Sequence, residues 1–348
     1  MPQKLSDIGE SGIIKLLKNS LGLDIGDDCA YTKIDSKFID NYLVTCTDAI
    51  CEGVHIPPAM SWEQIGKKSA TVNLSDIASM GAEAYGFLLS VGCSDILVSD
   101  FESMIIGAKN QVEKFGGNFL GGDIVRADKL FLDGAAIGLV KKPILRSGAR
   151  SGDLLCVTGT LGDAALGWDT LTSQSFSLFK RKLNYPGNSN YRKILKKVLE
   201  PEPRVFEGMV IGKYATAMMD ISDGLAPTVS EIAKQSKCGF EISKEKIPIS
   251  EAGKIVFEDF KNQKTYHKET LSQLSQKSII DYALYGGEDY ELLFTIPSDK
   301  ISCLISEFKE KFKTISFNII GQAVRENDIV IVDGGMRKKI SLRGYEHF

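Results

Sequence analysis

The chain has 348 residues, of which 43% are hydrophobic, and a formal net charge of −3. This length exceeds what one hydrophobic core usually serves, so two domains are expected. The slightly negative charge argues against a broad basic surface that would hold nucleic acid or anionic lipid. The expected partners are therefore small molecules or another subunit, with no nucleic acid and no membrane.

The compartment is predicted from the N-terminal residues and the cysteines. Residues 1–10 lack the basic start and apolar run of a secretory signal, and no later stretch is apolar enough to span a bilayer. The seven scattered cysteines form no CxxC pair and are interpreted as reduced, mostly buried thiols. These features together predict a cytoplasmic protein.

The first part of the chain alternates predicted helices and strands. Apolar residues among charges at 5–19 favour one or two short amphipathic helices. Further helices are expected at 62–80 and 100–115, and strands at 42–47, 85–92, 117–121 and 129–140. The cationic, Pro- and Gly-rich segment 141–152 is typical of a domain crossing. The predicted domains are accordingly 1–142 and 143–348.

The second part continues the mixed α/β pattern. Strands are expected at 154–160 and 215–222, each followed by a helical pattern. The beginning of 170–198 has no clear period and is interpreted as a variable surface insertion. The polar stretch 251–277 predicts no element.

Five short motifs place carboxylates where strands give way to turns or within helices that face such turns. They are IGDDCA (25–30), TCTDAICEGVH (45–55), VNLSDIASMGA (72–82), FLGGDIVR (119–126) and MMDISDG (218–224). Glycine beside Asp lets the backbone approach a phosphate closely, and Asp offers hard oxygen to a magnesium ion. Because Asp is also favoured in turns and at helix N-caps, any one motif alone is more often an ordinary turn.

The shortage of cations near these motifs favours a metal. No arginine occurs before Arg126. If the acids are buried together, their mutual repulsion demands a cation, and Mg²⁺ is the oxygen-seeking candidate. Arg126, Arg146 and Arg150 are candidates for gripping phosphate, with interdomain or surface ion pairs as the alternative, and Lys68 is a weaker candidate of the same kind.

Other catalytic patterns are absent from the sequence. It contains no GxxxxGK[ST] loop, no GxSxG elbow and no HExxH helix. Of the three histidines, His55 follows the Asp48 motif closely and is as consistent with a ligand contact as with a structural role. In ALYGGEDYELLFTIP (283–297), a Gly-Gly turn either presents Glu288 to a ligand or simply starts the next strand.

Taken in order, these motifs resemble the thiamine-monophosphate kinase family, in the superfamily of aminoimidazole ribonucleotide synthetase, selenophosphate synthetase and HypE. The resemblance extends from GESGIIKLL near the start to GYEHF at the end. It implies phosphorylation of thiamine monophosphate to thiamine diphosphate by ATP with Mg²⁺, as the last step of thiamine diphosphate synthesis. It also implies direct in-line transfer, in which positioning and charge neutralisation do most of the catalysis.

The resemblance also implies roles for individual residues. Asp48 and Arg146 would be catalytic. The metal ligands would be Asp28, Thr47, Asp48, Asp76, Asp123, Asp220 and Asp223. ATP would be contacted by Gly122, Asp123, Arg146 and Ser222. Thiamine monophosphate would be contacted by His55, Glu288 and Tyr345, the last of which could stack on a flat ring.

The architecture implied by the resemblance is a two-domain AIR-synthetase-like α/β fold. The N-terminal domain would share a β-barrel with its twin across a homodimer, and the C-terminal domain would be a mixed sheet flanked by helices. Two departures stand out: Cys46 where many relatives have Ser or Thr, and Ile105 where a relative can offer Tyr to the nucleotide.

Three alternatives remain open at this point. One is another enzyme of the superfamily, although the reactive Cys or selenocysteine of selenophosphate synthetases has no counterpart before Cys29. Another is a HypE-like partner protein, although the chain ends in Glu-His-Phe and not in Cys. The third is a regulatory nucleotide-binding protein that has lost activity, but the set of acids is intact.

Overall fold

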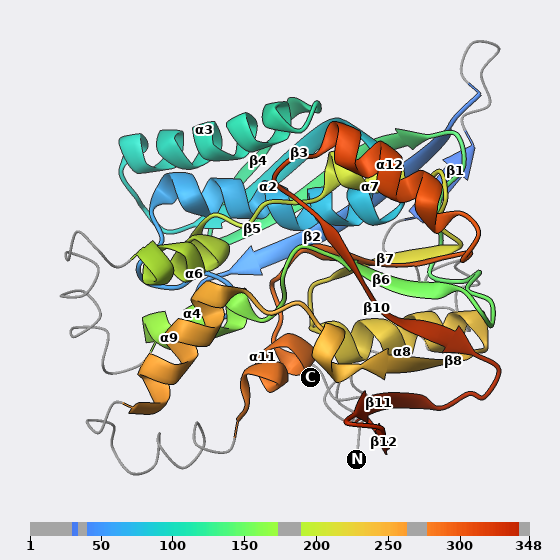
Figure 1. Ribbon diagram of the computed structural model, residues 1–348. Coiled ribbons are helices and arrows are strands. Elements are labelled where there is room, and N and C mark those ends of the chain that lie inside the picture. Colours follow the sequence, from blue (N-terminus) through green and yellow to red (C-terminus); the bar gives the residue numbers. More distant parts are fainter. Residues whose placement is uncertain (1–29, 34–39, 173–188, 263–276, 341–348) are drawn as a thin grey trace, which may run out of the picture.

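The computed structural model describes residues 30–33, 40–172, 189–262 and 277–340, and the strands of these residues form two sheets (Figure 1). The first sheet has five strands in the order β1-β2-β5-β3-β4. Only the β3–β4 pair is parallel. The strands are β1 (Ala30–Lys33), β2 (Tyr42–Cys51), β3 (Glu83–Cys93), β4 (Asn118–Arg126) and β5 (Phe131–Val140).

Helices α2 (Trp62–Ser79) and α3 (Val98–Lys114) cover one face of this sheet (Figure 1). Helix α2 begins with a capping box, in which the Ser61 hydroxyl accepts from Gln64 N and the Gln64 side chain accepts from Ser61 N. Most side chains of α2 are buried because its opposite side packs against α7 (Val205–Ile211) and a strand of the second sheet. Helix α2 therefore lies at the junction of the two halves.

The second sheet has seven strands in the order β12-β11-β8-β10-β6-β9-β7. It is mixed, since β8 and β11 run parallel whereas the other neighbours are antiparallel. Its strands are β6 (Leu154–Thr158), β7 (Ala217–Ile221), β8 (Gly239–Ser243), β9 (Glu291–Ile296), β10 (Phe317–Val324), β11 (Ile329–Asp333) and β12 (Met336–Lys339).

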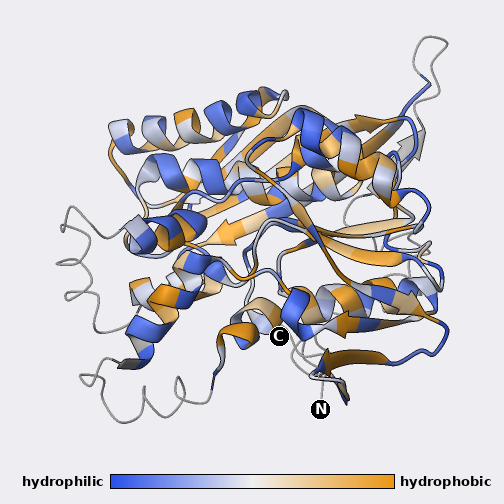
Figure 2. Ribbon diagram, in the orientation of Figure 1, coloured by the Kyte–Doolittle hydropathy of each residue, from blue (hydrophilic) through white to orange (hydrophobic). Residues whose placement is uncertain are grey.

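Helices flank the second sheet, and the central strands are strongly hydrophobic (Figure 2). Helix α8 packs on β7, β8 and β9, and α12 packs against α7. Helices α4, α6, α9 and α11 form a group of their own with a small hydrophobic core. The bounds are α4 (Asp163–Thr172), α6 (Ser189–Leu199), α8 (Leu225–Ser236), η2 (Lys244–Lys246), α9 (Glu251–Asn262), α11 (Ile279–Tyr285) and α12 (Ile301–Lys311).

The mixed α/β class predicted from the sequence is confirmed. Strand β4 extends to Arg126, five residues beyond its predicted end at 121, so Asp123 lies within a strand. Helix α9 occupies part of the polar stretch that predicted no element, because its apolar residues recur with helical spacing. The helices predicted at 5–19 lie outside the described residues.

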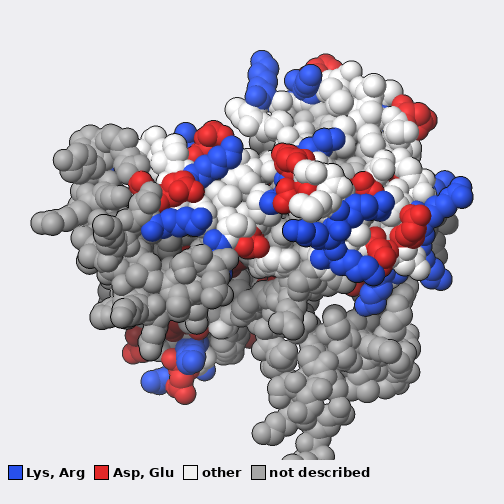
Figure 3. All heavy atoms as spheres, turned by 60° about the horizontal axis from the view of Figure 1, so that its bottom comes forward, with Lys and Arg blue, Asp and Glu red and all other residues white. Residues whose placement is uncertain are grey.

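The described strands close no barrel, and the five-stranded sheet has β1 and β4 at its edges. Within the same ranges no helix is long and apolar enough to cross a membrane. The described cysteines are all free thiols, and four of the six are buried. On the face seen in Figure 3, basic and acidic side chains are interspersed.

Candidate functional site

Asp48 is exposed near the end of β2, and its backbone is held by a side chain of α2. Asn73 Oδ1 accepts from Asp48 N at 2.9 Å, and Asn73 Nδ2 donates to the Asp48 carbonyl at 3.0 Å. Gly134 on β5 lies opposite Asp48, and a Cβ there would stand 2.3 Å from Asn73 Nδ2. Only glycine leaves room for this clamp, which fixes the position of Asp48.

Thr47 and Asp123 lie at the same end of the sheet as Asp48, and Asp133, which was not predicted as a site residue, lies on β5, between β2 and β3. Thr47 Oγ1 donates to Asp133 Oδ1 at 3.1 Å. The strand register places Asp133 opposite Ser90, and Ser90 opposite Asp123. Asp133 thereby adds a carboxylate between two predicted metal ligands.

Gly122 precedes Asp123 on the exposed strand β4. A Cβ at this position would stand 1.8 Å from the Leu89 carbonyl oxygen. The absence of a side chain therefore lets β3 and β4 pair closely. Asp123 itself is exposed, and one of its carboxylate oxygens accepts from Ile124 N at 2.8 Å.

Asp220 comes from the other sheet and reaches the N-terminal half through α2. It is buried near the end of β7, and Ser75 Oγ donates to its carboxylate at 2.7 Å. Asp76, the next residue of α2, is partly exposed. Ser222 and Asp223 are also partly exposed, in the turn between β7 and α8. Helix α2 thus brings a predicted metal ligand from each half into the same region.

Tyr290 shows that acids from both halves converge. Its side chain is buried at the start of β9, and its backbone N donates to the Ile221 carbonyl at 3.0 Å. Burial raises the pKa of its phenol well above the ordinary value, and the negative charges of four neighbouring carboxylates raise this pKa further. These carboxylates are Glu288, Asp48, Asp220 and Asp223.

Glu288 lies in the turn before β9 with a left-handed backbone, φ +68°. Its N–H donates to the Ser222 carbonyl at 2.6 Å, which ties this turn to the one that carries Asp223. Its carboxylate accepts from Lys68 Nζ at 2.5 Å, and the same ammonium donates to the His55 carbonyl at 2.7 Å. The structure therefore brings Glu288 and His55 together, and it buries Lys68 completely instead of presenting it to phosphate.

Arg146 lies in the connection between the halves, beside the beginning of β7. The preceding carbonyl, of Leu145, accepts from Met218 N at 3.0 Å, and the Arg146 carbonyl accepts from Ser236 Oγ at 3.2 Å. The predicted phosphate contact thus comes from a segment fixed to the same strand that carries Asp220.

Two predicted site residues, Asp28 and Tyr345, lie outside the described residues. Among the residues that the structure does describe, no three His, Cys, Asp or Glu side chains are grouped so that they could hold a metal ion.

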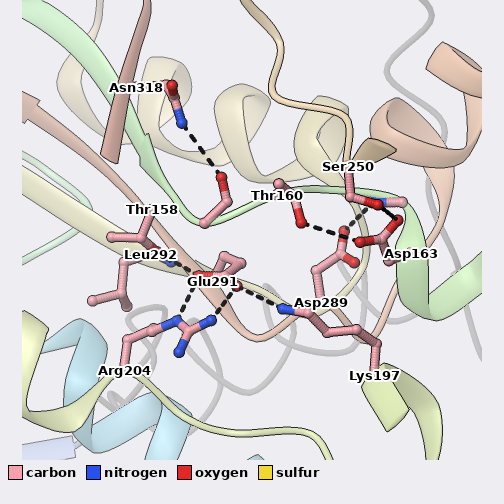
Figure 4. A network of polar contacts seen from close by, with 12 residues as sticks. Thr158, Thr160, Asp163, Lys197, Arg204, Ser250, Asp289, Glu291, Leu292 and Asn318 are labelled. Atoms are coloured by element: carbon pink, nitrogen blue, oxygen red, sulfur yellow. Dashed lines mark hydrogen bonds and ion pairs between the residues drawn. The ribbon is translucent and has the colours of Figure 1, made fainter. Parts of the chain in front are cut away.

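A buried network supports the turn that carries Glu288 and Tyr290 (Figure 4). Glu291 forms two hydrogen bonds with Arg204 and accepts from Thr158 Oγ1 at 2.8 Å and from Lys197 Nζ at 3.2 Å. Burial alone would raise the pKa of Glu291, but the charges of Arg204 and Lys197 outweigh it and lower this pKa to about 2. Glu291 is therefore a buried anion.

The neighbouring carboxyl of Asp289 has the opposite character. Gly162 N donates to Asp289 Oδ2 at 2.8 Å, while Oδ1 has no hydrogen-bond partner in the described part of the chain. Burial raises the pKa of Asp289 well above its ordinary value, and the nearby charges of Asp163 and Glu291 add to this effect. The network thus holds the loop with two carboxyls whose pKa values are shifted in opposite directions.

Several residues that position this site were not predicted from the sequence: Asn73, Ser75, Asp133, Arg204, Tyr290 and Glu291. Asn73 and Ser75 stand within the VNLSDIASMGA motif, and Tyr290 and Glu291 within GGEDYELLF. A polar residue on the helix face that carries Asp76 was the available signal for Asn73. No local sequence pattern indicated Arg204, because its partner Glu291 is 87 residues away along the chain.

Comparison with known families identifies the class of this fold. The family described as AIR synthase related protein, N-terminal domain, matches residues 26–140, and the corresponding C-terminal domain matches residues 150–333. The chain is thus an AIR synthase related protein with the two-domain mixed α/β fold of that class.

Individual relatives identify the family to which the chain belongs within this class. The chain is 36% identical to the thiamine-monophosphate kinase of Buchnera aphidicola subsp. Acyrthosiphon pisum, with 93% of this chain and 92% of the relative covered. It is 33% identical to that of Aquifex aeolicus, with 99% and 100% covered. A solved structure, AaThiL complexed with AMPPCP and TMP, matches with a TM-score of 0.82 at 30% identity, covering all of both chains. The chain belongs to the thiamine-monophosphate kinase family.

Proposed function

We propose that the protein phosphorylates thiamine monophosphate to thiamine diphosphate, with ATP as the phosphate donor. The observation that carries the proposal is that two residues of α2 hold acids from both halves, Asn73 the backbone of Asp48 and Ser75 the carboxylate of Asp220. Family membership over almost the full length supports it, and so does the likeness to AaThiL, whose structure holds AMPPCP and TMP. The reaction would be the last step in making thiamine diphosphate.

The donor types suit Mg²⁺, because they are carboxylate and hydroxyl oxygens from separate elements, although no three of the described acids are close enough together to share an ion. The proposed ligands are Thr47, Asp48, Asp76, Asp123, Asp220 and Asp223, together with Asp28 outside the described residues. When bound, Mg²⁺ would neutralise the negative charge of the two phosphate groups. The Asn73 clamp and the Ser75 hydrogen bond hold Asp48 and Asp220 in place beforehand.

The other proposed site residues divide between the two substrates. Gly122, Asp123, Arg146 and Ser222 would contact ATP, and His55, Glu288 and Tyr345 would contact thiamine monophosphate. The acceptor is already a phosphate monoester, so no strong base is needed to create the nucleophile. Asp48 and Arg146 would therefore act by aligning two anionic groups for direct in-line transfer.

We also propose a homodimer in which the N-terminal sheets of two copies pair to form a shared barrel. The support is the sheet face that α2 and α3 leave uncovered, where Leu88 is 41% and Leu120 51% exposed. Apolar residues of this size on an open sheet face mark an interaction surface. The domain boundary near Lys142 and the cytoplasmic location stay predictions of the same kind.

The proposed reaction is tested by incubating the protein with ATP, Mg²⁺ and either thiamine monophosphate, thiamine or other phosphate monoesters, and measuring ADP. Turnover is expected with thiamine monophosphate. Activity confined to another acceptor would overturn the substrate but not the kinase class. Asp48→Asn should abolish turnover in a folded protein, because it removes metal-binding charge while preserving shape; a folded, fully active variant would overturn the metal assignment.

A further inference from the structure

Lys68 is a fully buried lysine at the point where the two halves meet. It lies on α2, and its side chain has no solvent-exposed surface. Its ammonium donates to the His55 carbonyl and to Glu288 Oε1, and it lies 5.7 Å from the centroid of the Trp168 ring. One cation therefore joins α2, the segment after β2, the turn before β9 and the face of an aromatic ring on α4.

Because the Lys68 charge is buried, the contacts of its ammonium must compensate for the loss of water. A buried ammonium is tolerated only when it is paired and its hydrogens are satisfied. Lys68 meets this requirement with one carboxylate, one carbonyl and one aromatic face. Because removal of one partner of a buried pair leaves the other uncompensated, these segments cannot shift independently without cost.

Both hydrogen-bond partners of Lys68 belong to segments proposed to contact thiamine monophosphate. The Glu288 carboxylate is 22% exposed, so one side of it faces Lys68 while the other remains accessible. Its backbone has the left-handed conformation that non-glycine residues adopt only when their surroundings hold them there. The Lys68 contact and the Ser222 hydrogen bond supply such surroundings.

We propose that Lys68 is a positioning residue for thiamine monophosphate: it orients the Glu288 carboxylate and the His55 segment from the domain junction, without touching ATP. This inference rests on the proposed function. This role differs from the phosphate contact predicted from the sequence, because the Lys68 ammonium is paired with the Glu288 carboxylate and the His55 carbonyl. It also makes binding of thiamine monophosphate dependent on correct docking of the two halves.

Lys68→Met removes the charge and keeps most of the apolar stem. We expect its KM for thiamine monophosphate to rise at least tenfold, while its KM for ATP changes less than twofold. Lys67→Met is the matched control, because Lys67 is the preceding residue of α2 and, among the described residues, its side chain forms only a partly exposed pair with Glu63. It should leave both KM values within twofold of the wild type.

A purely structural role for Lys68 would lower kcat through loss of folded enzyme and leave both KM values unchanged. That result would overturn the proposal, as would an equal rise in both. Lys68→Gln, which keeps an N–H donor, should give a smaller rise in the same KM and replaces Lys68→Met if that variant does not fold. In a Glu288→Ala background, Lys68→Met should add no more than about threefold, because its main target is gone.

Amide hydrogen exchange in the ligand-free protein separates this inference from the proposed function. Lys68→Met should speed up exchange in 52–56 and 286–290 relative to Lys67→Met. Unchanged exchange in both segments would overturn the positioning role whatever the substrate is. Faster exchange in a protein whose wild type does not phosphorylate thiamine monophosphate would sustain the positioning role and reject the proposed reaction.

Discussion

Ser75 on α2 donates a 2.7 Å hydrogen bond to the carboxylate of Asp220 on β7, and both side chains are buried. This contact joins the helix that covers the first sheet to an edge strand of the second. Since Asp76 follows Ser75 directly, the bond also brings two proposed metal ligands into the same region. The acid site and the junction of the halves are therefore one structural feature.

Replacing Ser75 with Ala should weaken both the acid site and the junction of the two halves. We expect the free energy of unfolding to fall by about 1–3 kcal/mol, because Asp220 loses a buried donor. The apparent affinity for Mg²⁺ in the kinase assay should fall as well. Ser69→Ala is the control, because within the part of the chain that the structure describes the Ser69 hydroxyl bonds only to the Gly66 carbonyl of the same helix. If Ser75→Ala and Ser69→Ala lowered the free energy of unfolding and the Mg²⁺ affinity equally, the proposed role of the Ser75–Asp220 hydrogen bond would be refuted.

Asn73→Ala should act mainly on Asp48. The substitution removes both hydrogen bonds that clamp the Asp48 backbone. Loss of a group that orients a metal ligand typically costs about 10–100-fold in metal affinity. We therefore expect the Mg²⁺ concentration for half-maximal activity to rise by that order, with partial recovery at high Mg²⁺.

Gln111→Ala provides the comparison for Asn73→Ala. Gln111 is also buried, but its amide bonds to Thr71 and to the Pro201 carbonyl, away from Asp48. It should lower stability without changing the Mg²⁺ dependence. A Mg²⁺ dependence of Asn73→Ala that matches the wild type would refute the clamp.

The helices and strands of this fold could be predicted where the spacing of hydrophobic residues agrees with the residues that begin and end each element. Helix α2 is an example, expected at 62–80 and observed at Trp62–Ser79, because a capping box starts it and a glycine follows its end. Strand β4 was cut short in the prediction, because Gly121 and Gly122 resemble a turn. Gly122 continues the strand because a Cβ there would meet the Leu89 carbonyl oxygen on β3, whereas Gly121 is required by its positive φ of +124°.

The acids of the site could be recognised from motifs, but the groups that hold them could not. Asp48 and Asp220 were selected, while their partners Asn73 and Ser75 were not, although all four stand in quoted motifs. The reason is distance along the chain: Ser75 and Asp220 are 145 residues apart, and Lys68 and Glu288 are 220 apart. Local patterns carry no information on which helix face will meet which strand end.

The Arg204–Glu291 pair predicts a pH dependence of stability. Glu291 has a folded pKa of about 2 against an ordinary value of 4.5. A lowered folded pKa stabilises the protein above pH 4.5, and this contribution is lost as the pH falls from 4.5 toward 2. Glu291→Gln should cost about 3 kcal/mol in urea unfolding at pH 7, and the difference from the wild type should shrink across that window.

Glu113→Gln tests whether burial is responsible for this effect. Glu113 forms a salt bridge with Lys109 on the surface of α3, and its side chain is 48% exposed. Exposed pairs contribute less than about 1 kcal/mol. A pH-independent difference for Glu291→Gln, or one no larger than that of Glu113→Gln, would contradict the ionised state assigned to Glu291.

The uncovered face of the five-stranded sheet predicts the outcome of a charge substitution. In a two-fold interface each substitution occurs twice, and each buried, unpaired ammonium costs several kcal/mol. We expect sedimentation velocity to find wild-type protein at twice the mass of the chain and Leu88→Lys as a monomer. Ile106→Lys is the control, since Ile106 is similarly exposed, at 47%, but lies on α3. A monomeric wild type, or a Leu88→Lys variant that remains dimeric, would refute pairing through this face.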